Sequence, residues 1–570
     1  MQFVRVALCQ IDATVGDFKA NAVKVLAALD RAESLGADLA VFPELVLTGY
    51  PPEDLLLEPD FVAASERTLA EVASKTKRCA AVVGYVANDG GLRNAAAVCA
   101  DGRVLGVSYK ELLPNYGVFD ERRWFVPGAG RSPCYRIGGV LVGVVVCEDA
   151  WEPTGPVDRL ARQGAAVICS INASPFRVPA LREREQILVD RVRESQRPIV
   201  YVNLVGGQDE LVFDGGSMVV GSDGSLIAST AQFRELLVTV DVPVETTVPS
   251  DDAVVVEVSE TPRQQNAEPE SAPFEPPLDE VAEVYEALVL ATRDYVEKNR
   301  FGDVVIALSG GIDSSLVAAI ATDALGKARV HGVLMPSQFS SEGSVTDAEA
   351  LGASLGIDTR VIPIESAYAA LLELLAPSFG ELPSGVAEEN LQARVRGTLM
   401  MALSNKFGWL VLTTGNKSET AVGYSTLYGD TAGGFAVIRD VPKLLVYELA
   451  EYRNKQAGTF LIPEAVLLKP PSAELRLNQR DDDSLPPYDV LDPILEAYVE
   501  HHASIDDLVA LGNDPGTVQR IFDLVDAAEY KRRQAPPGPR VTSRGFGKDR
   551  RMPITNRFHQ EGSTRPSPKS

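Results

Sequence analysis

The chain has 570 residues and a formal net charge of −25, a length that predicts two to four domains. The acidic balance excludes a general nucleic-acid-binding protein, which needs a basic surface. The chain contains no run of 18 apolar residues, so we expect no membrane span. Its start lacks a basic region followed by a long apolar one, so we expect no signal peptide and a cytoplasmic protein.

Residues 1–245 alternate short apolar stretches with amphipathic helices such as 20–36, the pattern of an α/β domain. Candidate strands are 3–10, 37–44, 79–86, 140–147, 165–172 and 198–205. Several are almost continuously apolar, which indicates strands buried on both faces. We expect a linker at 246–278, because its second half is rich in Pro, Glu, Ser and Gln.

A second region, 279–550, again alternates strands with helices and predicts a mostly parallel α/β domain. A tail at 551–570 follows and is expected to be disordered. From Lys531 to the end there are eleven lysines and arginines against two acids. Such a run is usually a solvated surface, and covering phosphates is the alternative.

One cysteine, Cys147, ends an apolar run and is followed at once by two acids, in VVVCEDAW. Core packing is the simplest explanation for a cysteine, and we expect it for the other five. A nucleophilic thiol needs a base, yet the first histidine of the chain is His331. The base must therefore be a carboxylate, a lysine or another group. Glu44 and Lys110 each follow an apolar stretch, and the ends of such strands can meet at one edge of a sheet.

The stretches FPELVLTGYPPEDLL, SYKELLPNYGVFDERRWFVPG and VVVCEDAW resemble, in this order, the nitrilase superfamily. The resemblance covers about residues 1–245 and implies an α-β-β-α sandwich. It also implies that Glu44 is the general base, Cys147 the nucleophile and Lys110 a stabiliser of the oxyanion, together with a backbone N–H beside the cysteine. Glu148 and Asp149 are then expected to shape the turn rather than take part in the chemistry.

The same resemblance implies a set of glutamine-binding residues, namely Tyr116, Phe119, Glu121, Ser174 and Arg182. Arg182 is included as a substitute. The family usually carries a basic residue about six positions after the serine, and this chain has Ala180 there.

The stretch SGGIDSS, Ser309–Ser315, lies between a predicted strand and a predicted helix. Two glycines let the backbone approach a phosphate, and the following helix start favours an anion. Asp313 could hold Mg²⁺ on the same phosphates. The stretch matches neither a Walker A loop nor a G-x-G-x-x-G fingerprint. The alternative is a glycine-rich turn that merely caps a helix.

This stretch resembles the PP-loop ATP pyrophosphatases, and ENLQARVRG, LTTGNKSETAVGYSTLYGDTAGG and KPPSAELRLNQRDDDSLPPYDVLD narrow the resemblance to the NAD synthetase family. A Rossmann-like fold, ATP as co-substrate and Mg²⁺ as cofactor are implied. The implied ATP-binding residues are Ser309, Gly310, Gly311, Ile312, Asp313, Ser314, Ser315 and Thr414. Those implied for deamido-NAD are Asn390, Arg394, Glu419, Asp430, Lys443 and Lys531, and Asp313 and Glu419 would hold the metal.

Together the two halves resemble the glutamine-dependent NAD synthetase family. That implies hydrolysis of glutamine, transfer of ammonia between the domains, amidation of deamido-NAD through an acyl-adenylate, and a homo-oligomer, with the octamer as one form in the family. Glutamine, ATP and deamido-NAD are the expected partners. Three alternatives remain: a PP-loop amidotransferase for another acceptor, an amidase with a degenerate nucleotide-sensing domain, and a non-catalytic scaffold. The ENLQAR and TTGNKSE stretches argue against the first. The intact SGGIDSS loop and Glu419 argue against the second, and a scaffold would be expected to lack the Glu44, Lys110 and Cys147 set.

Overall fold

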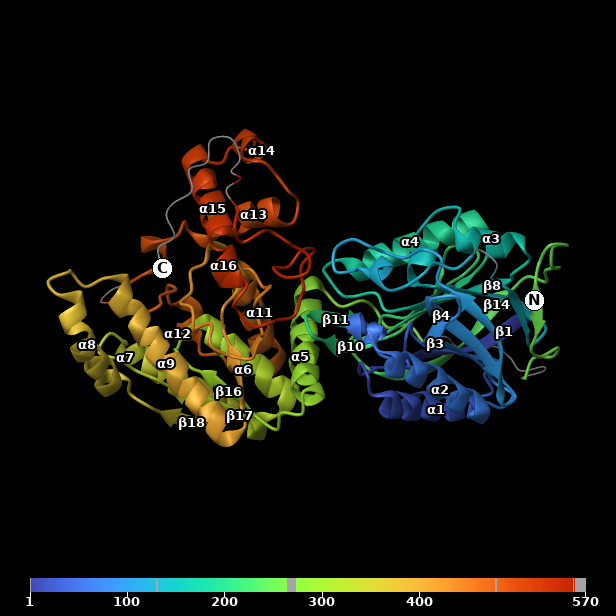
Figure 1. The fold of residues 1–570 in the computed structure, drawn as a ribbon, viewed down its shortest axis with the longest axis horizontal. Coiled ribbons are helices and arrows are strands. Elements are labelled where there is room, and N and C mark those ends of the chain that lie inside the picture. The colour runs from blue at the N-terminus through green and yellow to red at the C-terminus, as the bar shows by residue number, and fades with distance from the viewer. Residues whose placement is uncertain (1, 130–131, 264–272, 477–478, 557, 559–570) are drawn as a thin grey trace. The chain divides into compact units, whose positions relative to one another are not determined.

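The computed structural model of the chain describes residues 2–129, 132–263, 273–476, 479–556 and 558. It divides into two compact units, Met1–Leu278 and Asp279–Ser570 (Figure 1). Among the helices of the described ranges, none is both long and apolar enough to cross a membrane.

Unit 1 contains two sheets and a short two-stranded ribbon. The first sheet has the order β14-β1-β2-β3-β4-β5, and the second β13-β12-β9-β8-β7-β6-β15. Strands of the first sheet are β1 (Gln2–Gln10), β2 (Leu39–Val41), β3 (Ala80–Asn88), β4 (Leu92–Ala100), β5 (Arg103–Tyr109) and β14 (Leu236–Val244). Those of the second are β6 (Cys134–Ile137), β7 (Val140–Val146), β8 (Val167–Asn172), β9 (Ile199–Asn203), β12 (Met218–Val220), β13 (Leu226–Ser229) and β15 (Val255–Glu257). The ribbon pairs β10 (Val205–Gln208) with β11 (Leu211–Asp214).

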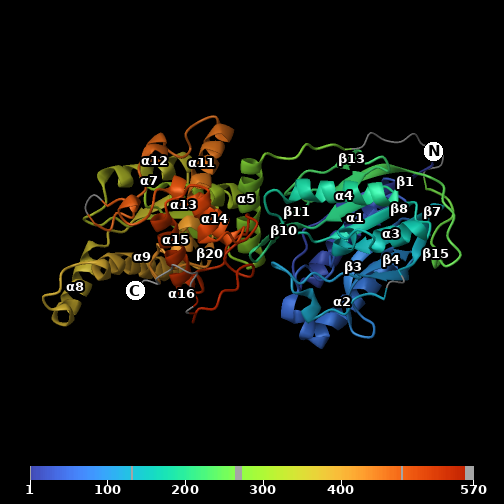
Figure 2. The same ribbon diagram turned by 90° about the horizontal axis from the view of Figure 1, so that it is seen from above.

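The layers of unit 1 are helix, sheet, sheet, helix (Figures 1 and 2). Helices α1 (Phe18–Ser34) and α2 (Pro59–Lys75) pack on the first sheet through one hydrophobic cluster. Helices α3 (Pro156–Arg162) and α4 (Ala180–Ser195) pack on the second through another. A third cluster, rich in valine, fills the space between the sheets. The nearly continuous apolar composition of strands such as β7 and β8 explains this arrangement, since both of their faces are buried. The predicted α-β-β-α sandwich is confirmed.

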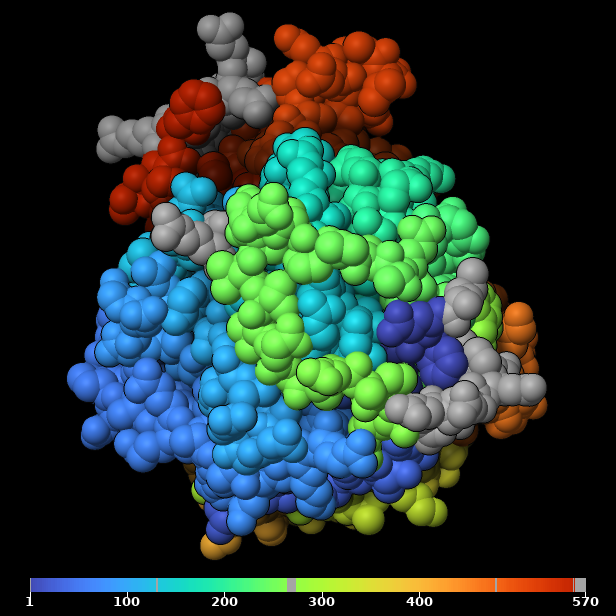
Figure 3. Space-filling view, turned by 90° about the vertical axis from the view of Figure 1, so that its right-hand side faces the viewer, coloured from blue at the N-terminus to red at the C-terminus, as the bar shows by residue number. Residues whose placement is uncertain are grey.

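The segment expected to be a linker, 246–278, lies within unit 1. Its strand β15 pairs in parallel with β6, and Val256 and Val258 pack against the cluster between the sheets. Figure 3 shows this stretch, in light green, running along the outside of the unit. Valines 254–256 favour a strand. The polar residues that follow them in the sequence make this strand signal hard to recognise, so the sequence predicts a linker for the segment. The most Pro- and Glu-rich part of the segment, 264–272, lies outside the described residues.

Unit 2 is built on one parallel sheet with the order β18-β17-β16-β19-β20. Its strands are β16 (Val304–Ala307), β17 (Val330–Leu334), β18 (Asp358–Val361), β19 (Leu410–Thr413) and β20 (Phe435–Ala436). From β16, the first strand of unit 2 in the sequence, the chain adds β17 and β18 on one side and then β19 and β20 on the other, so the strand order reverses at β16. In open α/β sheets, ligands bind at such a reversal, beyond the carboxyl ends of the strands. The predicted Rossmann-like domain is confirmed.

Helices flank the sheet of unit 2 and form a further helical cluster (Figures 1 and 2). Near the sheet lie α5 (Glu280–Lys298), α6 (Ile312–Leu325), α7 (Glu342–Leu355), α8 (Glu365–Phe379), α9 (Val386–Phe407), α11 (Lys443–Ala457) and α12 (Glu464–Leu468). The helical cluster comprises α10 (Lys417–Val422), α13 (Tyr488–Val499), α14 (Ile505–Ala510) and α15 (Pro515–Ala527), followed by α16 (Glu529–Arg532). This cluster has its own apolar core, in which Ile494, Ile521 and Phe522 are buried.

Candidate functional sites

The thiol of Cys147 stands at a sharp turn between β7 and the 3₁₀ turn η3 (Cys147–Ala150). Its backbone φ is +47°, in the left-handed region that side chains other than glycine rarely adopt. Strained backbone of this kind clusters at functional sites. Burial, together with the nearby Glu44 carboxylate, raises the pKa of the thiol well above its usual value. The resting thiol is therefore protonated, and any attack by its sulfur needs a base.

Glu44 and Lys110 meet in the buried interior beside this turn. Lys110 Nζ donates to Glu44 Oε1 at 2.8 Å and to Glu121 Oε1 at 2.9 Å, and the three side chains are at most 4% exposed. Asn94 Nδ2 also donates to Glu44 Oε1, at 2.6 Å, and the hydroxyl of Tyr50 donates to Glu121 Oε1 at 2.9 Å. A lysine held by two carboxylates is a fixed cation at the thiol.

Burial and the neighbouring charges together set the charge states of this cluster. It raises the pKa of Glu121 to about 7, although Lys110 opposes that rise. For Lys110, burial alone would lower the pKa, but the Glu121 and Glu44 carboxylates outweigh it and raise the pKa well above its usual value. Lys110 is thus positively charged at neutral pH and available as a stabiliser of negative charge.

Of the residues predicted to bind glutamine, Glu121 lies beside Lys110, and the other four divide into three places. Ser174 Oγ lies 3.7 Å from Cys147 Sγ. Tyr116 and Phe119 stack edge to face with ring centroids 5.7 Å apart, and the exposed Tyr116 hydroxyl donates to Glu148 at 3.0 Å. Arg182 lies exposed on α4.

The functional groups of unit 1 come from both sheets. Glu44 and Lys110 follow β2 and β5 of the first sheet, whereas Cys147 and Ser174 follow β7 and β8 of the second. Glu44 Oε2 accepts from the backbone N–H of Ala173, at 2.9 Å, which joins the two sets. A thiol, a carboxylate and a buried cation in one place are what acyl transfer to sulfur requires.

The phosphate-loop candidate of unit 2 connects β16 to α6. Gly310 has φ of +76°, and a Cβ at this position would lie 2.1 Å from Ser344 O, so only glycine fits. Ser314 Oγ and Ser315 Oγ both donate to Gly311 O, at 3.1 and 2.8 Å, and so fix the first turn of the helix. The result is a tight loop that ends on free N–H groups at a helix start, the geometry that binds phosphate.

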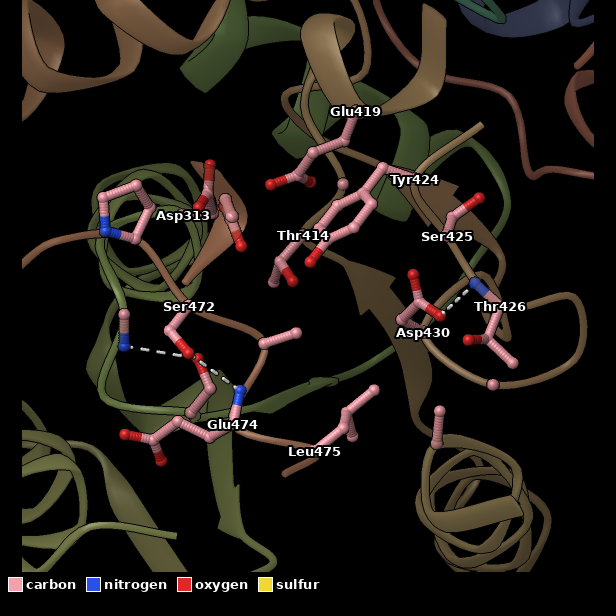
Figure 4. Close-up of a pocket in the computed structure, with 18 of the residues that line it drawn as sticks. Asp313, Thr414, Glu419, Tyr424, Ser425, Thr426, Asp430, Ser472, Glu474 and Leu475 are labelled. Atoms are coloured by element: carbon pink, nitrogen blue, oxygen red, sulfur yellow. Dashed lines mark hydrogen bonds between the residues drawn. The ribbon is translucent and has the colours of Figure 1, made fainter. Parts of the chain in front are cut away.

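Two carboxylates and an ammonium converge beside this loop. Lys443 Nζ donates to Asp313 Oδ2 and lies 3.6 Å from Glu419 Oε1. Asn416 Nδ2 donates to Asp313 Oδ1 at 2.9 Å and also caps α10, on which Glu419 lies. Burial, with the Asp313 charge, raises the pKa of Glu419 to about 8. Figure 4 shows Asp313, Glu419 and Thr414 facing the same space.

Asp313, Thr414, Glu419 and Lys443 line a cavity of about 1210 Å³, large for a single nucleotide. Elsewhere along its wall, Asp430 Oδ1 accepts from the backbone N–H of Thr426 at 2.6 Å (Figure 4). Asn390 Oδ1 accepts from Thr426 Oγ1 at 2.7 Å. Lys531 Nζ donates to the carbonyl of Ser425 at 2.8 Å, and burial lowers its pKa.

The predicted ATP and dinucleotide residues therefore lie together, with two at the edge. Those that line the cavity are Ser309, Gly310, Gly311, Ile312, Asp313, Ser314, Asn390, Thr414, Glu419, Asp430, Lys443 and Lys531. Ser315 is buried in the first turn of α6. The Nε of Arg394 donates to Leu427 O at 3.2 Å, in the loop behind Thr426.

The chain matches two family models in succession, the carbon-nitrogen hydrolase model over residues 5–250 and the NAD synthase model over residues 284–535. It is 46% identical to the glutamine-dependent NAD(+) synthetase of Thermotoga maritima, across 98% of this chain and the whole of that protein. It is 43% identical to the same enzyme of Acinetobacter baylyi, across 98% of this chain and 99% of that one. The chain belongs to the glutamine-dependent NAD(+) synthetase family.

The fold comparison agrees with this membership. The structure of the Acinetobacter baumannii family member in complex with ADP matches 99% of this chain and all of that one, with 41% identity and a TM-score of 0.74. The Cytophaga hutchinsonii family member, at 21% identity and a TM-score of 0.81, shows the same fold over 97% of the chain. Members of this family are enzymes that combine a glutaminase domain with an NAD synthase domain.

Several residues at the two sites were not predicted from the sequence. In unit 1 these are Asn94 and Tyr50, whose partners Glu44 and Glu121 lie 50 and 71 positions away along the chain. In unit 2 they include Asn416, Arg396 and Lys469, which line or border the cavity. Asn416 and Lys469 lie within stretches that carried the family resemblance, and Arg396 is two residues after Arg394. The sequence therefore pointed to Asn416, Arg396 and Lys469 only through the predicted residues and motifs beside them.

Proposed function

We propose that this protein makes NAD from deamido-NAD, using ATP and the amide nitrogen of glutamine. The observation that carries the proposal is the coexistence, in one chain of this family, of a buried thiol beside a Glu–Lys pair and a phosphate loop beside paired carboxylates. The first suits the hydrolysis of an amide and the second suits the activation of a carboxylate by ATP.

In unit 1 the proposed reaction begins with proton transfer from Cys147 to Glu44. The sulfur then attacks the side-chain amide carbon of glutamine, and Lys110 with a backbone N–H beside the cysteine stabilises the oxyanion. The same proton passes to the leaving nitrogen, ammonia departs, and a thioester remains. Water activated by Glu44 hydrolyses the thioester and releases glutamate.

Recognition of glutamine would fall to the residues around the thiol. Ser174, 3.7 Å from the sulfur, and Glu121 are in reach of the amide. Tyr116 and Phe119 form an aromatic wall beside them. Arg182 is the candidate for the α-carboxylate and would approach from the exposed side of α4.

In unit 2 the phosphate loop would hold the phosphates of ATP, with Thr414 at the nucleotide. Asp313 and Glu419 would hold Mg²⁺, because two carboxylates that complete their coordination with phosphate oxygens are a usual site for this ion. Within the described ranges no third acidic, histidine or cysteine side chain is grouped with them. Mg²⁺ bound there would neutralise charge on the phosphates, a task that Lys443 shares.

Deamido-NAD would occupy the other side of the cavity, near Asn390, Arg394, Asp430 and Lys531. An oxygen of its nicotinate carboxylate attacks the α-phosphorus of ATP, pyrophosphate leaves, and an acyl-adenylate forms. Ammonia then attacks the acyl carbon and displaces AMP, which gives NAD. At neutral pH free ammonia is mostly ammonium and unreactive, so a sheltered passage between the two sites belongs to the proposal.

Two reciprocal variants test this function, assayed with deamido-NAD and Mg-ATP and with either glutamine or ammonium chloride. Cys147→Ala should lose NAD synthesis from glutamine and keep synthesis from ammonia. Asp313→Ala should lose pyrophosphate release with either donor and keep much of the glutaminase. Equal loss of both donors in Cys147→Ala would contradict separate sites. Glutamine hydrolysis and ATP cleavage with another acceptor, but no NAD, would indicate a different amidotransferase.

A further inference from the structure

One buried carboxylate, that of Asp149, connects the two sheets of unit 1 at the thiol. Its Oδ1 accepts from the backbone N–H groups of Glu111 and Leu112, at 3.0 and 2.8 Å. Its Oδ2 accepts from the backbone N–H of Val146, at 3.3 Å. The side chain is 2% exposed. Its hydrogen bonds among the described residues go to these backbone N–H groups and not to the side chains of Cys147, Glu44 or Lys110.

The three donors lie next to the proposed catalytic residues. Glu111 and Leu112 directly follow Lys110, just after β5 at one edge of the first sheet. Val146 directly precedes Cys147, at the end of β7 in the second sheet. One oxygen of Asp149 therefore fastens the backbone that carries the cation, and the other fastens the backbone that carries the nucleophile. A single carboxylate thus joins the backbone beside Lys110 to the backbone beside Cys147.

We propose that Asp149 is a positioning residue, which sets the distance and direction between Lys110 Nζ and Cys147 Sγ by tying their backbones together. The inference rests on the proposed glutaminase reaction and goes beyond it, because Asp149 bonds to the backbone beside the reacting groups rather than to the groups themselves. Catalysis of this kind is sensitive to placement, and a displacement of about 1 Å can cost a hundredfold in rate. The Glu44 tie to Ala173 N at 2.9 Å does not replace it, because that bond restrains the base rather than the cation.

Asp149→Asn is the sharpest perturbation, since it keeps the volume of the side chain. An amide has one acceptor oxygen and one donor nitrogen, so it can satisfy the loop side or the turn side but not both. On the side that receives the amide nitrogen, this nitrogen faces a backbone N–H group, so two donors meet and the hydrogen bond there is lost. We expect the rate of glutamine-derived thioester formation to fall by about a hundredfold per folded molecule. NAD synthesis from ammonia should be unchanged.

Asp38→Asn is the matched control. Asp38 is 3% exposed, and its two oxygens accept from the backbone N–H groups of Arg5, at 3.0 Å, and Arg263, at 2.7 Å. Neither partner belongs to the proposed site. The two variants should therefore lose comparable thermal stability. Only Asp149→Asn should form the thioester more slowly than wild type, and only in that variant should an alkylating reagent modify Cys147 more slowly.

The outcomes separate the hypotheses. Equal rates per folded molecule in Asp149→Asn and wild type would overturn the inference, and so would an equal loss in the two variants. If Asp149→Asn does not fold, Asp149→Glu keeps the charge but displaces the oxygens, and a wild-type alkylation rate in that variant would overturn it as well. Wild-type protein that forms no thioester at Cys147 would instead refute the proposed function.

Discussion

Replacement of Lys110 by methionine tests the charge balance at the thiol. The ammonium lies 2.8 Å from Glu44 and 2.9 Å from Glu121, and all three side chains are buried. Removing one partner of a buried ion pair costs about 3–5 kcal/mol, because the remaining charge is left without compensation. At about 2 °C per kcal/mol for a domain of this size, the unfolding midpoint of unit 1 should fall by roughly 6–10 °C.

The pH dependence of that loss follows from Glu121. Burial raises the pKa of its carboxyl group to about 7, so below that pH the group takes up a proton and no longer needs a cation. A carboxyl whose pKa is higher in the folded state than in the unfolded state favours folding at low pH, and this contribution is lost as the pH rises through its folded value. The destabilisation by Lys110→Met should therefore be larger at about pH 8 than at about pH 5.5.

Differential scanning calorimetry of the full chain measures the effect, with each transition assigned by its response to Mg-ATP. Lys110→Met/Glu121→Gln is the matched variant, because it removes one of the two uncompensated carboxylates. It should melt at a higher temperature than Lys110→Met, and both should lack glutaminase activity. A single variant as stable as wild type at pH 8, or a double variant no more stable than the single one, would refute the reasoning.

Two further substitutions test one group in each unit. Glu44→Gln cannot take up the proton of Cys147, so thioester formation, followed by mass spectrometry, should fall by about 10²–10⁴-fold; normal trapping of the thioester would remove Glu44 as the base. Gly310→Ala places a Cβ 2.1 Å from Ser344 O at a φ of +76°, so pyrophosphate release should be lost while glutamine hydrolysis persists. Gly302→Ala is its control, because among the described residues nothing beyond the two chain neighbours lies within 4 Å of a Cβ there. Equal activities of the two variants would disprove a tight fit at the loop.

Much of the fold could be predicted from the sequence because the strands are apolar runs between glycine and polar turns. Cys147, Glu44 and Lys110 could be singled out for the same reason, since each directly follows such a run. Asn94 could not, because it lies inside β4 and its partner Glu44 is 50 positions away. Contacts of this kind depend on how strands are ordered in the sheet, and local pattern carries no information on that order.

The strand β15 eluded prediction for a different reason. Its three residues, Val255–Glu257, pair with the edge of a sheet formed more than a hundred residues earlier. A short edge strand has little pattern of its own, and the neighbouring prolines and glutamates favour a linker. The tertiary partner, rather than local propensity, decides the conformation here.

The division of the thiol site between two sheets makes the interior between them part of the chemistry. Val98 on one sheet and Val142 on the other are fully buried in that interior, and neither side chain carries a group that reacts. Interiors are close-packed, so enlarging or shrinking such a side chain shifts whole strands rather than filling a void. Hydrophobic substitutions at these valines should therefore alter the turnover of glutamine while the use of free ammonia stays normal. Variation between relatives in this apolar layer is then a means by which donor preference can change without any exchange of a polar residue.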